Sequence, residues 1–177
     1  MPVTKPKIFT VMKFLLSILV GVTAWLGAAA PAAAEVTVGQ PFPDIADFHL
    51  TPTLPIQQDR VVLVDFWATW CAPCQWSFPA YNSLQKEFGA QGLTIIGVSV
   101  DRDEETYNQF VEKHHPTFTT LIDIEQHLAA AVHPSAMPTC YLIDRHGVVR
   151  DIFTGFHGAA TTARLREEII KLLGDKS

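Results

Sequence analysis

The stretch VVLVDFWATWCAPC, residues 61–74, decides the fold and indicates the chemistry of this chain. Residues 61–67 are aliphatic or aromatic except for one aspartate, which is typical of a central strand that is covered on both faces. Cys71 and Cys74 follow where this strand passes into a segment whose composition predicts a helix to about Phe88. Two cysteines with this spacing at the start of a helix indicate a dithiol redox centre.

The two cysteines are expected to have different roles. Cys71 would face the unpaired N–H groups and the positive dipole end of the helix, which lower the pKa of a thiol and favour the attacking thiolate. Cys74, one turn further along, would then attack a mixed disulfide formed at Cys71 and release the reduced partner. The pair is therefore predicted to cycle between dithiol and disulfide.

The first 34 residues have the pattern of a secretory signal peptide. Three lysines precede an apolar core of 13 residues, 14–26, and three alanines end the segment before Glu35. This core is shorter than the roughly 20 residues that span a bilayer, so we expect cleavage after Ala34. The alternative is an uncleaved membrane anchor, because residues 14–34 are all uncharged. Both readings place residues 35–177 in the periplasm or another exported location.

Size and charge limit the possible functions of this exported domain. Removal of residues 1–34, which hold three lysines and no acid, leaves 10 basic and 18 acidic residues and a formal charge of −8. Nucleic acid is therefore not expected as a partner. The length suits one compact domain, which we expect to be a monomer. Three cysteines are too few for a disulfide scaffold, and no phosphate-binding glycine loop or other sign of an organic cofactor is present.

Strands and helices are expected to alternate after a proline-rich lead-in. This order, with a hairpin late in the chain, predicts an α/β fold of three layers, in which helices cover both faces of a mixed central sheet. The lead-in, residues 35–60, is expected to pack over one edge of the sheet. The remaining strands are expected at 93–100, 118–122, 139–143 and 148–154, and the remaining helices at 103–114, 125–132 and 159–173.

Taken together, these motifs resemble the thioredoxin superfamily, and within it the exported TlpA/ResA-like thiol:disulfide oxidoreductases, over residues 36–173. The resemblance is carried by residues 64–68 before Trp70 and the cysteine pair, by Pro79, by Met137-Pro138-Thr139 and by Gly155. It implies a thioredoxin-like fold and an enzyme that exchanges disulfides with protein substrates, with a membrane thiol reductant as its electron donor. Reduction is favoured over oxidation, because Ala72 and Pro73 carry no charge or imidazole that would stabilise a Cys71 thiolate.

The resemblance also implies roles for residues around the cysteines. Pro138 would form a cis peptide bond beside the dithiol, leaving the Met137 backbone free to pair with an extended substrate segment. Trp70, Ala72 and Pro73 would complete the substrate-binding surface.

Asp65 is the only charged residue in residues 61–68, so its carboxyl should be buried and the pKa of that carboxyl raised. By resemblance to thioredoxin it is expected to act as a general acid/base toward Cys74.

Other functions remain open from the sequence. His133 and Met137 could join the two cysteines as soft ligands for Cu(I), giving a copper chaperone for oxidase assembly. The proline-rich lead-in also resembles that of peroxiredoxins, which would make the chain a peroxidase, although no proline precedes Thr69 in the register of that family's pattern. A structural zinc site is disfavoured because a second ligand pair is missing, and Cys140 is expected to be inert. ResA-like relatives that serve cytochrome c maturation carry an acidic residue where this chain has Arg102.

Overall fold

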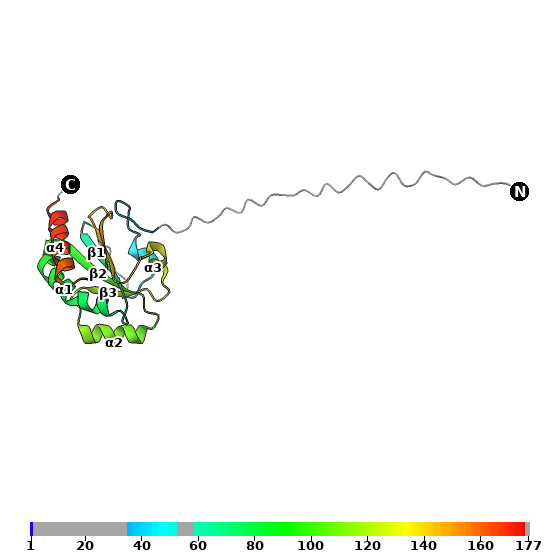
Figure 1. The fold of residues 1–177 in the computed structure, drawn as a ribbon, viewed down its shortest axis with the longest axis horizontal. Helices are drawn as coiled ribbons and strands as arrows, with labels where there is room; N and C mark the ends of the chain where they lie inside the picture. The colour runs from blue at the N-terminus through cyan, green and yellow to red at the C-terminus, as the bar shows by residue number, and fades with distance from the viewer. Residues whose placement is uncertain (2–34, 53–58, 176–177) are drawn as a thin grey trace. The chain divides into compact units, whose positions relative to one another are not determined.

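A computed structural model describes residues 1, 35–52 and 59–175 (Figure 1). A five-stranded sheet has the strand order β3-β2-β1-β4-β5, in which β1, β2 and β3 are parallel and β4 is antiparallel to both β1 and β5. The strands are β1 (Val61–Trp67), β2 (Leu93–Ser99), β3 (Thr119–Ile122), β4 (Thr139–Ile143) and β5 (Val149–Thr154). The helices are α1 (Ala72–Phe88), α2 (Glu104–His114), α3 (His127–Val132) and α4 (Ala159–Gly174), with 3-10 turns η1 (Ile45–Phe48) and η2 (Gly89–Gln91).

The predicted signal peptide or anchor, residues 1–34, lies outside the described residues apart from Met1. Among the described residues, no helix combines the length and apolarity needed to cross a membrane.

The predicted three-layer α/β architecture is confirmed. Aromatic side chains show which helices share a face of the sheet: Trp67 of β1 lies 5.0 Å from Phe78 of α1 and 4.9 Å from Phe110 of α2, measured between ring centroids. Arg166 of α4 pairs with Glu87 of α1, so α4 lies on this face as well. Figure 1 shows α1, α2 and α4 grouped together, with α3 on the other side.

The opposite face is covered by α3 and the lead-in. Phe66 points to this side, because successive side chains of a strand alternate between faces, and it packs against Tyr141 of β4. Phe42 of the lead-in contacts the same tyrosine at 5.4 Å. All seven residues of β1 are consequently buried. The strand is almost entirely apolar because other segments of the chain pack on both of its faces.

The lead-in differs from its prediction. It was expected over one edge of the sheet, but it contacts both edges: Pro41 forms a bridge with Val148, next to β5, and Thr51 forms one with Ile122 of β3. Pairing of this kind covers the backbone of edge strands, which would otherwise be open to another chain. The alternation of prolines with short apolar pieces does not reveal this path, because it depends on contacts distant in the sequence.

Helix α3 begins two residues later than predicted. The segment before it forms a turn in which Gln126 N–H donates to the Asp123 carbonyl at 2.8 Å and Gln126 adopts a left-handed conformation. The Asp123 carboxylate accepts from Ala129 N–H at 2.8 Å, which satisfies a free donor of the first helical turn. The helix can therefore start only at His127.

The packing of β1 on β2 requires a residue without a side chain at Gly97. A Cβ atom there would lie 3.1 Å from both Trp67 Nε1 and Phe118 Cε2. We expect Gly97→Ala to lower the free energy of unfolding by about 1–3 kcal/mol through overpacking. Gly174→Ala is the matched control, because its Cβ would meet no atom within 4 Å. Denaturant unfolding measures both, and equal midpoints for Gly97→Ala and wild type would contradict this account.

Candidate active site

The two predicted redox cysteines form a disulfide at the N-terminus of α1. Their Cα atoms are 5.3 Å apart. Cys71 is the N-cap residue, and its Sγ accepts a hydrogen bond from Cys74 N–H at 3.3 Å. Cys71 retains 6% of its surface exposed whereas Cys74 is fully buried, so the sulfur of Cys71 is the one that a partner can approach.

A buried carboxylate holds the loop that carries the disulfide. Asp101, just after β2, accepts hydrogen bonds from the Thr69 backbone N–H and from the Thr69 hydroxyl, both at 2.9 Å. The Ser99 hydroxyl donates to the same carboxylate at 2.7 Å. Gln75 of α1 donates to the Thr69 carbonyl at 3.0 Å. The position of Cys71 relative to β2 is thus fixed by hydrogen bonds as well as by packing.

Asp65 lies in the core on the α1 side of β1. Its Oδ1 accepts a hydrogen bond from the Tyr81 hydroxyl at 3.0 Å, whereas Oδ2 has no partner within the described residues. Burial raises the pKa of the Asp65 carboxyl to about 8, against a smaller lowering by the Tyr81 hydrogen bond. The burial and the raised pKa expected from the sequence are both found, because a charged carboxylate loses its hydration in this apolar setting.

Cys140 completes a buried cluster with Asp65 and Tyr81. It is a free thiol that pairs in register with Asp65 across β1 and β4, so the two side chains share a face. Burial, followed by the neighbouring Asp65, holds the pKa of the Cys140 thiol well above its usual value. The pKa of Tyr81 is likewise raised, first by burial. A thiol in this environment stays protonated and is a poor nucleophile.

Sequence reasoning did not single out Tyr81. The available signal is its spacing: Tyr81 lies seven residues after Cys74, which places both on one side of α1, two turns apart. Nothing in the sequence shows that its hydroxyl reaches Asp65, because that contact joins a helix to a strand.

The predicted substrate-binding residues lie around the disulfide. The Met137–Pro138 peptide bond is cis, as expected. Within the described residues the Met137 backbone makes no hydrogen bond, whereas the Pro138 carbonyl accepts from Gly155 N–H at 2.7 Å. Trp70 is 72% exposed, Ala72 is exposed and Pro73 is half-buried.

A cleft of about 720 Å³ opens between the Met137 loop and the loop of Trp70, the residue that directly precedes Cys71. It collects residues from four separate segments, which the sequence does not place together. Its lining consists of Thr69, Trp70, Val100, Asp101, Arg102, Asp103, Thr106, Gln126 and Met137.

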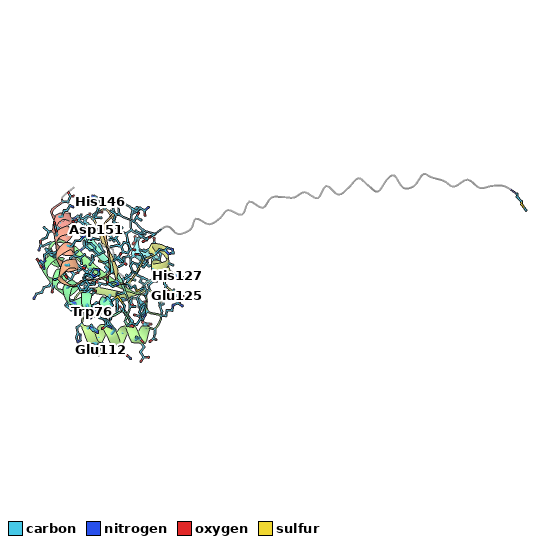
Figure 2. All side chains as sticks on the ribbon, in the orientation of Figure 1. Trp76, Glu112, Glu125, His127, His146 and Asp151 are labelled. Carbon is cyan, nitrogen blue, oxygen red and sulfur yellow. A yellow bond between two sulfur atoms is a disulfide. The ribbon has the colours of Figure 1, made fainter. Side chains whose placement is uncertain are left out.

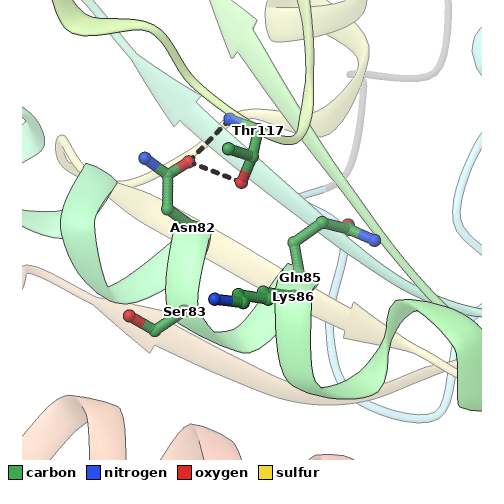
Figure 3. A pocket seen from close by; sticks show the side chains of 5 residues that line it. All are labelled: Asn82, Ser83, Gln85, Lys86 and Thr117. Atoms are coloured by element: carbon green, nitrogen blue, oxygen red, sulfur yellow. Dashed lines mark hydrogen bonds between the residues drawn. The ribbon is translucent and has the colours of Figure 1, made fainter.

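A second hollow, of about 490 Å³, lies further along α1 (Figure 3). Asn82 Oδ1 accepts from the Thr117 backbone N–H at 2.7 Å and from its hydroxyl at 3.0 Å. These bonds tie α1 to the segment before β3, and the hollow is two to three turns of helix away from the cysteines. It therefore has the features of a structural junction.

The alternative that metal ligands converge at the cysteines is not supported by the described residues. No group of three or more His, Cys, Asp or Glu side chains there is arranged to hold a metal ion, so His133 does not join the cysteines in such a group. Figure 2 shows His146 well away from His127, the first residue of α3.

Comparison with known proteins agrees with this geometry. Residues 38–152 match the model of the AhpC/TSA family. The thioredoxin-like protein YneN of Bacillus subtilis is 36% identical over 149 residues, which cover 80% of this chain and 86% of that protein. The thiol-disulfide oxidoreductase ResA of Geobacillus kaustophilus is 33% identical over 126 residues, covering 68% and 71%.

A solved structure has the same fold. The crystal structure of a protein described as the thiol:disulfide interchange protein DsbE of Chlorobium tepidum superposes with a TM-score of 0.74 at 30% identity. The match covers 79% of this chain and all of that one. Together with the disulfide at the start of α1, these similarities show that the chain belongs to the AhpC/TSA family and is a thiol-disulfide oxidoreductase of the thioredoxin superfamily.

Proposed function

We propose that this protein reduces disulfides of other proteins in an exported compartment, with Cys71 as nucleophile, Cys74 as resolving thiol and Asp65 as general acid/base. The single observation that carries the proposal is the asymmetry of the cysteine pair. Cys71 caps the helix and is partly exposed, whereas Cys74 is buried on the same side of α1 as Tyr81, whose hydroxyl donates to Asp65.

The first step is attack by the Cys71 thiolate on a substrate disulfide. A bond forms between Cys71 Sγ and one substrate sulfur, the substrate S–S bond breaks, and the second substrate sulfur leaves as a thiolate that takes a proton from solvent. Negative charge on Cys71 Sγ is stabilised by the Cys74 N–H group at the helix N-terminus. In the disulfide this N–H group already donates to Cys71 Sγ.

The second step releases the substrate. Cys74 loses its proton to the Asp65 carboxylate and attacks Cys71 Sγ, which forms the Cys71–Cys74 disulfide and frees the remaining substrate thiolate. Two electrons have then passed to the substrate. The resemblance to relatives implies that a thiol reductant in the membrane then reduces the Cys71–Cys74 disulfide and restores the dithiol.

Substrate binding uses the backbone edge at Met137. Its N–H and C=O, which have no hydrogen-bond partner among the described residues, suit an extended polypeptide segment added beside it, as in other cases of strand addition. Trp70, Ala72 and Pro73 supply the apolar surface around the reacting sulfur. Such backbone recognition accepts many sequences, which suits an enzyme that acts on proteins.

The roles of the two cysteines are tested by trapping. In the fully reduced Cys74→Ser variant, a mixed disulfide between Cys71 and a protein substrate should accumulate, because the resolving thiol is absent. Cys71→Ser should form none. Non-reducing electrophoresis and mass spectrometry measure the adduct. If the Cys71→Ser variant instead formed the mixed disulfide, the roles of the two cysteines would be reversed. In a separate assay, consumption of peroxide that requires Cys71 but not Cys74 would favour the peroxidase alternative.

The direction of electron flow is tested by the reduction potential of the cysteine pair in the full chain. We expect a value near that of thioredoxin, about −270 mV, because residues 72–73 carry no group that stabilises a Cys71 thiolate. Alkylation after equilibration in dithiol buffers measures it. A potential near that of DsbA, about −120 mV, would make the protein an oxidant. The copper alternative would be favoured by two results together: no reversible two-electron oxidation of the cysteine pair, and binding of Cu(I) by the reduced protein in competition with a chelator.

The role of Asp65 is tested by the pH dependence of substrate release from the mixed disulfide. With a pKa of about 8, about a tenth of the Asp65 carboxyl is ionised at pH 7, so the rate should rise with pH to a midpoint near 8. Asp65→Asn should remove this rise and slow release by about one to two orders of magnitude. Tyr81→Phe should move the midpoint to higher pH. The Tyr81 hydrogen bond lowers the pKa of the Asp65 carboxyl, so its removal should raise that pKa.

Tyr107→Phe is the matched control for Tyr81→Phe. The Tyr107 hydroxyl also makes one 3.0 Å hydrogen bond, but to Thr120 on β3. Its removal should leave the midpoint unchanged. Rapid-quench measurements over pH 6–10 follow the release step, and a wild-type profile in Asp65→Asn would exclude Asp65 from the mechanism.

A further inference from the structure

Arg102 lines the cleft next to Trp70, and its charge has no ion-pair partner among the described residues. Two aspartates flank it in the sequence, yet it forms an ion pair with neither, nor with any other acid in the part of the chain that the structure describes. Within the described residues, its guanidinium makes one hydrogen bond, to the neutral amide of Gln126, at 3.0 Å from Arg102 Nη2 to Gln126 Oε1. Arg102 is exposed, so its other N–H groups are open to the cleft.

The neighbouring carboxylates are engaged elsewhere. Asp101 accepts from Thr69 and Ser99, which holds the loop before Cys71. Asp103 is the N-cap of α2 and accepts from the backbone N–H of Thr106 at 3.0 Å and from the Thr106 hydroxyl. Both carboxylates therefore have structural partners, and the guanidinium is the group of this triplet that remains available to a ligand.

Gln126 holds the guanidinium in place. Its Nε2 donates to the Val100 carbonyl at 2.8 Å, while its Oε1 accepts from Arg102. The backbone of Gln126 is left-handed, with φ of 56°, a conformation that costs energy for a residue other than glycine. Strained backbone of this kind is often retained where a side chain must be aimed. Both ends of the Gln126 amide are thus committed, which restricts the Arg102 side chain to the cleft.

A substrate segment that pairs with the Met137 backbone would pass close to this cation, because both residues line one cleft. Trp70 and Met137 line the same cleft as Arg102, and Trp70 directly precedes Cys71. Guanidinium groups match the geometry of a carboxylate, to which they donate two parallel hydrogen bonds. We propose that Arg102 binds an acidic side chain of the substrate polypeptide, near the cysteine that Cys71 attacks, and so favours acidic disulfide-bearing segments. This inference rests on the proposed function.

The charge of the domain favours a single acidic side chain over a polyanion. Residues 35–177 carry a formal charge of −8, which repels extended anions, whereas a local cation selects one carboxylate at short range. The cleft therefore adds a sequence preference to the backbone recognition at Met137.

The test uses the full chain and pairs of peptide disulfides. The two peptides of a pair are identical except for one residue, which is Glu in one and Gln in the other. One pair is made for each of the three positions before and the three positions after the cysteine. We expect kcat/KM to be about three- to tenfold higher for Glu at one or more of these positions in 20 mM NaCl, with the preference weakening in 500 mM NaCl. Arg102→Gln should abolish the preference. Gln126→Ala, which releases the guanidinium, should reduce it.

Arg166→Gln is the matched control. It changes the net charge equally on α4, where Arg166 pairs with Glu87, and should keep the preference. Equal kcat/KM for the Glu and Gln peptides at all positions, or an unchanged preference in Arg102→Gln, would overturn the inference. If the wild-type protein reduced neither the Glu nor the Gln peptide, the proposed function itself would fail. This result is distinct from equal reduction of both peptides, which would overturn only the inference about Arg102.

Discussion

Burial of β1 between two layers is the constraint on which the rest of the structure depends. Because α1 covers one face of the strand and the lead-in and α3 cover the other, every side chain of residues 61–67 is removed from water. Pairing with β2 and β4 on both edges then fixes the register, since a shift by one residue would exchange the two faces. The cysteine pair follows directly after this strand, so its position is fixed as well.

The same burial creates the electrostatic character of the site. Asp65 is fully buried, and this burial outweighs the hydrogen bond from Tyr81 and raises the pKa of its carboxyl to about 8, a range useful for proton exchange near neutral pH. In the cleft next to Trp70 the arrangement is the opposite, because Asp101 is satisfied by Thr69 and Ser99 while Arg102 keeps an exposed charge. The site thus combines a buried acid, Asp65, with an exposed cation, Arg102.

Several features of this site were predictable from local sequence. The strand over residues 61–67, the helix that begins at the cysteines and the burial of Asp65 all follow from side-chain type and spacing. The predicted cis bond before Pro138 required the family resemblance as well. The path of the lead-in was predicted wrongly, because its two bridges join residues more than 70 positions apart.

The sequence by itself determined the order of strands and helices, the cysteine pair and the presence of one acid in an otherwise apolar strand. Periodicity and residue type carry this information, because each depends on neighbours along the chain. Only the tertiary structure decided that Tyr81 donates to Asp65, that Cys140 faces the same carboxyl and that Gln126 holds Arg102 in the cleft. These contacts join different strands, helices and loops, so they arise only when packing brings those segments together.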